Sequence, residues 1–239
     1  MLTRGWPVDA SEGAALAEAS PADMTTPAVV TVHVWTPTGQ LAPINRGVSR
    51  YVAAFKENGV VSAGHAALEA PGLYISHYPA AELDRSRDFR RSLRATEDND
   101  MPGHFLPSYA AEVADWSGST MQVQLKGLNT AALAAFWAAY RCDSTYNLTN
   151  RNCSSVVAKA LDAGLEGIFA APARSIYFNM RLFLAPELWV AGFMRRRAGA
   201  MAWTPGLVLD YARALSVVIA LPTRLAERKA RAVWGRAVE

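Results

Sequence analysis

The chain has 239 residues, of which 51% are hydrophobic, so it can fill a sizeable core. Its formal net charge of +3 is small, and nothing in the sequence resembles a nucleic-acid-binding module, so we expect no nucleic-acid partner. Two cysteines are too few for a disulfide framework, and they predict reduced thiols and synthesis in the cytoplasm.

Residues 1–28 are rich in Ala, Ser, Pro and acidic side chains, which predicts a flexible N-terminal lead. They lack the charged-then-apolar order of a cleaved signal peptide. The protein could still leave the cell by a secretion route that needs no such signal. No run of consecutive apolar residues is long enough to cross a bilayer as a helix.

A run of β-branched residues predicts the first strand, Val29 to Trp35. His33 lies in this strand, and we interpret it as a hydrogen-bonded structural histidine, which is commoner than a catalytic one. A hairpin follows, in which the strands 64–69 and 73–78 are joined by the tight turn Ala70-Pro71-Gly72.

The hairpin places two histidines near each other. His65 lies at the start of one strand, and His77 lies near the end of its partner. Antiparallel pairing around a three-residue turn brings these two strand ends together. The charged stretch that follows, residues 80–100, is interpreted as an exposed loop with a solvated surface.

The alternation of residues 121–125 predicts another strand. A helix is then predicted from Asn129 or Thr130, both capping types, to about Arg141. Its buried stripe consists of Leu133, Phe136, Trp137 and Tyr140.

Cys153 lies in the first turn of a predicted helix that ends at Gly164. Asn152 can cap this helix, and the apolar residues after the cysteine share one helical face. Unpaired N–H groups and the positive end of the helix dipole stabilise a thiolate there. A useful thiolate needs a base, and we expect His65 to meet Cys153 in space. Cys142, which precedes the polar turn, is interpreted as structural.

The C-terminal third, residues 168–239, differs in character from the rest of the chain. Residues 168–194 are apolar, residues 207–221 predict an apolar helix, and Pro222 is expected to end or kink it. A basic amphipathic tail, residues 224–238, closes the chain. These segments are expected to pack on the core, and the alternative is binding to an anionic membrane surface.

Three short motifs carry a resemblance to a known superfamily: Gly64-His65-Ala66-Ala67-Leu68, Tyr74-Ile75-Ser76-His77, and Asn152-Cys153-Ser154-Ser155-Val156-Val157. Together they resemble the circularly permuted papain-like (NlpC-type) cysteine hydrolases, a superfamily that includes lecithin:retinol acyltransferase-like, YiiX-like and PPPDE-like enzymes. Histidine before cysteine is the order of the permuted branch. The resemblance covers about residues 29–165, and with it we assign residues 29–167 to a catalytic core.

The resemblance implies an α+β fold in which a small antiparallel sheet packs against the cysteine-bearing helix. It implies Cys153 as nucleophile, His65 as base and His77 as the group that orients the base. If the strand register shifts by one residue, Ser76 takes the place of His77. Tyr146, which resembles a tyrosine before the family's cysteine, would help the backbone N–H of Cys153 to stabilise an oxyanion.

The expected reaction is acyl transfer or hydrolysis through a thioester at Cys153, without a cofactor. Ligand pairs with metal-site spacing are missing, so we expect no metal. The favoured substrates are lipid acyl esters, as in a phospholipase, and the alternative is a peptide or peptidoglycan amide. A second alternative is an inactive binding module, which the intact set of Cys153, His65 and His77 disfavours. By family analogy the chain could be a bacterial effector or toxin domain, and a toxin would imply an inhibitor protein as partner.

Overall fold

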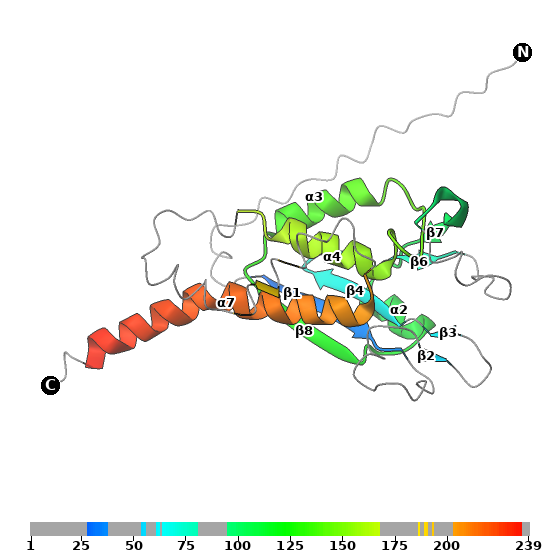
Figure 1. The fold of residues 1–239 in the computed structure, drawn as a ribbon. Coiled ribbons are helices and arrows are strands. Elements are labelled where there is room, and N and C mark those ends of the chain that lie inside the picture. Colours follow the sequence, from blue (N-terminus) through cyan, green and yellow to red (C-terminus); the bar gives the residue numbers. More distant parts are fainter. Residues whose placement is uncertain are drawn as a thin grey trace, which may run out of the picture.

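The centre of the fold is a four-stranded antiparallel sheet with the strand order β5-β4-β1-β8 (Figure 1). The computed structural model describes residues 28–37, 54–55, 61–62, 64–80, 95–167, 186, 189–190, 193 and 203–235. The four strands are β1 (Val29–Trp35), β4 (His65–Ala70), β5 (Leu73–Ile75) and β8 (Met121–Lys126). The predicted α+β class is therefore confirmed.

Helices and short strands surround this sheet. The described helices are α2 (Tyr109–Asp115), α3 (Thr130–Tyr140), α4 (Cys153–Gly164), α7 (Pro205–Gly235) and the 3-10 turn η3 (Glu97–Asn99). Two small antiparallel pairs consist of β2 (Ala54–Phe55) with β3 (Val61–Ser62), and β6 (Tyr78–Pro79) with β7 (Gly103–His104). The predicted lead before residue 28 and most of the apolar segment 168–194 lie outside the described residues.

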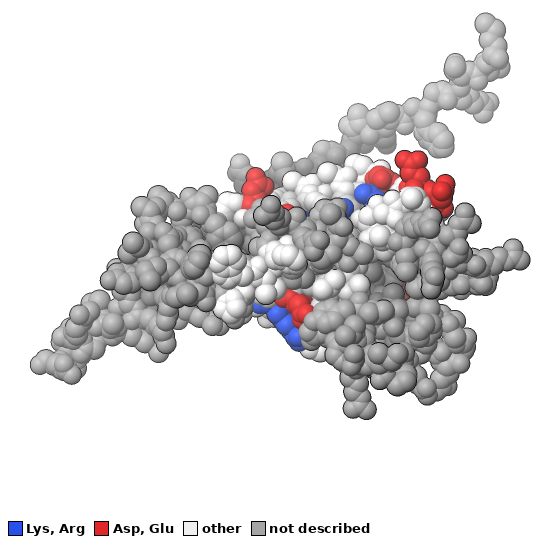
Figure 2. Space-filling view, in the orientation of Figure 1, with Lys and Arg blue, Asp and Glu red and all other residues white. Residues whose placement is uncertain are grey.

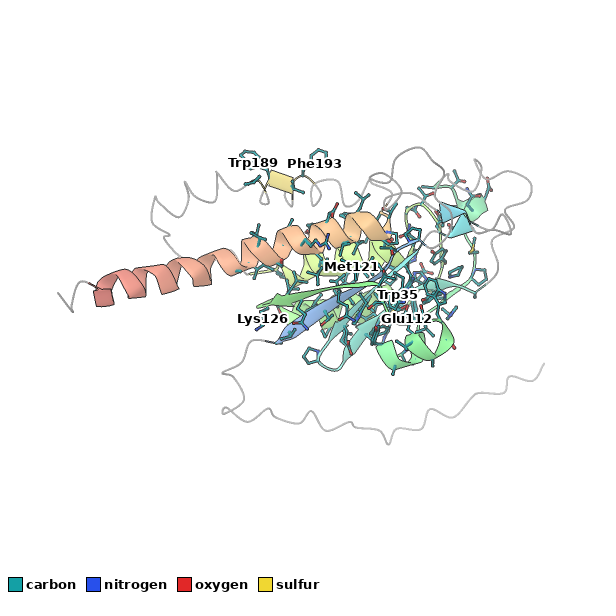
Figure 3. The ribbon with its side chains drawn as sticks, turned by 90° about the horizontal axis from the view of Figure 1, so that it is seen from below. Trp35, Glu112, Met121, Lys126, Trp189 and Phe193 are labelled. Carbon is teal, nitrogen blue, oxygen red and sulfur yellow. The ribbon has the colours of Figure 1, made fainter. Side chains whose placement is uncertain are left out.

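The two faces of the sheet are covered by different helices. Alternating residues of β1, Val30, Val32 and Val34, pack into the main core with α3, α4 and the first half of α7. On the other face Trp35 forms a smaller cluster with residues of β4, β5 and α2. Figure 3 shows the same division, with α7 on one side of the sheet and α2 on the other.

The strongly patterned elements form where the sequence predicts them. The first strand has the predicted bounds, and α3 begins after Asn129, whose side chain accepts from Ala132 N at 3.0 Å. In α4, Asn152 and Ser155 form a capping box that satisfies two N–H groups at the helix start. His33 is hydrogen-bonded, as we interpreted it, with Nε2 3.0 Å from Glu69 Oε2 and Nδ1 3.3 Å from Ser119 Oγ.

The helix does not end at Pro222, as one alternative of our prediction had it, because α7 is one helix from Pro205 to Gly235. An interior proline costs about 3 kcal/mol. The residues after it are mostly Ala, Leu, Arg, Lys and Glu, which propagate a helix that is already formed. The turns before it are anchored by buried side chains such as Leu209 and Leu215. Figure 1 shows the last turns of α7 extending away from the sheet.

Charged side chains are few on one face of the molecule. On the face seen in Figure 2 most described residues are uncharged, and the acidic and basic side chains form small separate groups. Among the described residues, no helix combines the length and the apolar character needed to cross a membrane.

Candidate active site

His65 is held at the first position of β4 by the glycine before it. It pairs with Trp35 of β1. Gly64 has φ +70°, and a Cβ at this position would lie 2.3 Å from the carbonyl oxygen of Trp35. Only glycine meets both conditions, because a positive φ disfavours other side chains and this close approach excludes a Cβ.

The β4–β5 turn sets the register on which the site depends. The turn has two central residues, Pro71 and Gly72, because Ala70 pairs directly with Leu73. Gly72 has φ +69°, as the third residue of a type II turn with proline before it requires. The three-residue turn that we predicted is therefore one residue too long, and the register differs by one residue.

This shift decides which side chains share a face with His65. When the pairing is continued past Ile75, Tyr78 comes opposite His65 and Ser76 opposite Ala67. Ser76 and Tyr78 then lie on the face of His65, and His77 lies on the other. The contacts agree, since the Tyr78 ring stacks on His65 with 4.0 Å between centroids, and Ser76 Oγ lies 3.2 Å from His65 Nε2.

The structure places His77 away from His65, in contrast to our expectation. Its Nε2 donates to the carbonyl oxygen of Ser144 at 3.2 Å, and its Nδ1 accepts from the Tyr140 hydroxyl at 3.0 Å. Both ring nitrogens are therefore occupied, and neither is left to orient His65. Burial lowers the pKa of His77 to about 4, so the ring is neutral at physiological pH. These contacts give His77 a structural role.

The group that does contact His65 is Glu112, which sequence reasoning missed. His65 Nε2 donates to Glu112 Oε1 at 2.7 Å. The carboxylate is fully buried, and it also accepts from the hydroxyls of Tyr78, at 2.5 Å, and Tyr74. Ser76 Oγ lies 3.5 Å from the same carboxylate. These donors compensate for the burial of a negative charge.

Glu112 reaches the site from α2, a helix that we did not predict. Ser108 caps it by accepting from Ala111 N at 3.1 Å. The Tyr109 ring stacks on His33 of β1 with 4.0 Å between centroids, and this contact holds α2 against the sheet. A proline and a capping serine before Tyr-Ala-Ala-Glu are the local signal for this helix. Nothing local indicates that its glutamate is buried.

The structure brings His65 and Cys153 together. Cys153 begins α4 and is 8% exposed, and His65 is 2% exposed. Each side chain shifts the pKa of the other through its charge and hydrogen bonding, and the backbone N–H of Ala66 also lowers the pKa of the Cys153 thiol. Since Nε2 of His65 faces Glu112 and Ser76, Nδ1 is the nitrogen left for the sulfur.

The three groups favour their charged forms together. Burial by itself would lower the pKa of His65, but the Cys153 thiolate and Glu112 raise it to about 9. Burial would raise the pKa of the Cys153 thiol, but the charge and hydrogen bond of His65 lower it below its ordinary value. Burial would also raise the pKa of Glu112, but the hydrogen bond and charge of His65 lower it. Their mutual interactions therefore favour the thiolate of Cys153, the imidazolium of His65 and the ionised carboxylate of Glu112.

Tyr146 lies next to Cys153. It is 5% exposed, and its pKa responds to both the backbone and the side chain of Cys153, so the two residues are close together. Burial and the nearby thiolate raise the pKa of Tyr146 well above its usual value. The loop is held by backbone hydrogen bonds between Tyr146 and Met101 in both directions, at 2.8 and 2.9 Å.

Cys142 and His104 make contacts with residues other than Cys153 and His65. Cys142 is exposed, and its thiol donates to the carbonyl oxygen of Ala138 at 3.2 Å. His104 stacks on the side of Tyr78, with 5.7 Å between ring centroids. Across the described ranges, no three His, Cys, Asp or Glu side chains are grouped so that they could hold a metal ion.

Comparison with known proteins identifies one family. Residues 76–233 match the family model described as the IcsB middle domain. The matched range includes Glu112, Tyr146 and Cys153, and it begins after His65. No curated protein and no solved structure is similar enough to count as a match. Because the family model covers more than half of the 239 residues, this chain belongs to the IcsB middle domain family.

Proposed function

We propose that the chain is a cysteine-dependent acyltransferase or acyl hydrolase that works through a thioester at Cys153. The observation that carries this proposal is the buried pair Cys153 and His65, in which His65 lowers the pKa of the thiol while Glu112 holds the Nε2 of His65 at 2.7 Å. IcsB itself is an effector acyltransferase of Shigella, which supports acyl transfer and a role as a secreted bacterial effector.

In the first half of the reaction, the Cys153 thiolate attacks the acyl carbon of the donor. The negative charge moves to the carbonyl oxygen, next to the backbone N–H of Cys153 and the hydroxyl of Tyr146. The bond to the leaving group then breaks, and the His65 imidazolium donates its proton to that group. The products are a thioester on Cys153, a neutral His65 and a free leaving group.

In the second half, an acceptor or a water molecule attacks the thioester carbon, and neutral His65 takes its proton. The carbon–sulfur bond breaks, and the thiolate–imidazolium pair returns. Glu112 stays ionised in both halves. It holds the ring so that Nδ1 faces the sulfur, and it stabilises the positive charge on His65.

We further propose that the core is a permuted papain-like fold. Two features support this: the base opens a strand of the antiparallel sheet, and the nucleophile follows later in the chain at the start of a helix. The orienting acid comes from α2, between these two elements, and not from the strand next to the base.

For the substrate we propose lipid acyl esters and, as the alternative, peptide or peptidoglycan amides. The lipid proposal rests on the C-terminal part. The last turns of α7 extend away from the sheet (Figure 1), and the sequence there contains Arg224, Arg228, Lys229 and Arg231. Such a helix suits an anionic membrane surface. An inactive binding module is disfavoured because a buried ion pair with a third buried charge costs desolvation that binding alone does not require.

The test is intact-protein mass spectrometry of the wild-type chain, Cys153→Ala and Cys142→Ala after incubation with phospholipids or with peptidoglycan fragments. We expect an acyl adduct on the wild type and on Cys142→Ala, and none on Cys153→Ala. The donor that produces the adduct identifies the substrate class. An adduct on Cys153→Ala, or product formation by that variant, would refute the thioester mechanism.

A further inference from the structure

Trp116 is an exposed aromatic residue beside the buried ion pair. It follows the last residue of α2, and its backbone N–H donates to the carbonyl oxygen of Glu112 at 3.0 Å. Its ring stacks on Trp35 with 6.1 Å between centroids and meets His65 edge to face at 6.4 Å. Even so, Trp116 is 46% exposed.

Two other aromatic residues pack against His65, and both are less exposed than Trp116. Tyr78 stacks on the imidazole at 4.0 Å and is half-buried, and Trp35 lies at 5.3 Å and is almost fully buried. Among the aromatic residues that the structure describes around His65, Trp116 therefore presents the largest surface to solvent. Figure 3 shows Trp35 and Glu112 together on the α2 side of the sheet.

This position matters because of the proton that His65 moves. In the second half of the reaction the acceptor X–H attacks the thioester carbon, a bond forms between X and that carbon, and the carbon–sulfur bond breaks. The proton of X–H passes to neutral His65, and the sulfur leaves as the thiolate. The attacking atom must therefore reach the edge of His65, and an acceptor there keeps water from the same place.

We propose that Trp116 is the platform on which the acyl acceptor binds, and that it decides the ratio of acyl transfer to hydrolysis. This inference rests on the proposed function, because it presupposes a thioester at Cys153. The indole face favours an acceptor with an apolar or aromatic group next to its nucleophilic atom. Val113, 39% exposed on the same helix, has no aromatic face to offer an acceptor and provides a matched control.

The experiment measures how a thioester formed on the enzyme is divided between two fates. p-Nitrophenyl octanoate acylates the protein, and the burst of p-nitrophenol counts the thioesters formed. Benzyl mercaptan is then offered as an aromatic acceptor and 2-mercaptoethanol as a small one, and the S-benzyl or S-hydroxyethyl product is compared with free octanoate. The product ratio reports only the second half of the reaction, since the leaving group has already departed.

Trp116→Ala should keep the burst and lower the ratio of benzyl transfer to hydrolysis about threefold to tenfold, the range of one aromatic contact. The ratio for 2-mercaptoethanol should change by less than about twofold, and Trp116→Phe should retain most of the benzyl transfer. In Val113→Ala the ratio of benzyl transfer to hydrolysis should stay within about twofold of the wild-type ratio, as expected of a substitution at an exposed position.

The outcomes separate the two proposals. If the wild type gives no burst and no adduct on Cys153, the proposed function fails. If the burst appears and the benzyl ratio is the same in Trp116→Ala, or falls equally in Val113→Ala, the acceptor platform is refuted. If Trp116→Ala loses the burst through misfolding, Trp116→Leu and Trp116→Phe decide: a benzyl ratio equal in these two variants and the wild type refutes the platform.

Discussion

The contact between Glu112 and His65 makes a sharp prediction for the variant Glu112→Gln. The substitution preserves the shape of the side chain and removes its charge, 2.7 Å from His65 Nε2. A hydrogen bond to a charged group contributes about 1.5–3 kcal/mol, and one pKa unit corresponds to about 1.4 kcal/mol. The pKa of His65, about 9 in the wild type, should therefore fall by about one to two units in the variant.

The pKa of His65 can be measured without a substrate, by nitrogen-15 NMR of labelled histidine. The chain has four histidines, and the variant His65→Gln assigns the signal. The control is Glu69→Gln, which removes a carboxylate 3.0 Å from His33 and should leave the titration of His65 unchanged. As pH rises, the acylation rate of Glu112→Gln should begin to fall at a lower pH than that of the wild type, because neutral His65 cannot protonate a leaving group. A His65 that titrates at the same pH in the wild type and in Glu112→Gln would show that Glu112 does not stabilise the imidazolium.

The remaining predictions concern reactivity, stability and membrane binding. Iodoacetamide near pH 6 should alkylate Cys153 well before Cys142, because His65 lowers the pKa of Cys153; preferential labelling of Cys142 on a peptide map would contradict this. His77 has a folded pKa of about 4 against the ordinary 6.5, so its contribution to stability is complete above pH 6.5 and is lost as pH falls toward 4. The loss should reach about 3 kcal/mol, measured by urea unfolding, and His77→Gln should show a correspondingly smaller slope with pH. Gly64→Ala should lower the melting temperature and the acylation rate together, because its Cβ would lie 2.3 Å from Trp35 O at φ +70°; unchanged values of both would count against the placement of His65. Liposome co-sedimentation should increase with anionic lipid and decrease with salt if the basic turns of α7 bind membranes, and a protein that ignores liposomes would refute that proposal.

Local sequence patterns were sufficient to predict the strands and helices that have a clear periodicity or a clear capping residue. The β-branched run of residues 29–35 forms β1, and the stripe from Leu133 to Tyr140 lies on α3. The capping residue Asn152 predicts the start of α4, and with it the position of Cys153 in the first helical turn. Each of these features depends on a few neighbouring residues, so the sequence alone determined them.

The choice between Ser76 and His77 depended on one residue in a turn. A two-residue turn at Pro71 and Gly72 places Ser76 on the face of His65, whereas a three-residue turn would have placed His77 there. Side chains alternate along a strand, so an error of one residue in the turn moves every side chain to the opposite face. Pro-Gly is itself a local signal for the shorter turn.

Only the tertiary structure decided that Glu112 is the partner of His65. The two residues are far apart in the sequence, and the carboxylate becomes buried because α2 folds onto the sheet through Tyr109 and His33. An exposed glutamate and a buried one look alike in a sequence, since the difference lies in which hydroxyls and which imidazole surround the carboxylate after folding. The same folding sets the charges of the site, because the low pKa of Cys153 and the high pKa of His65 arise from their contact and their shared burial.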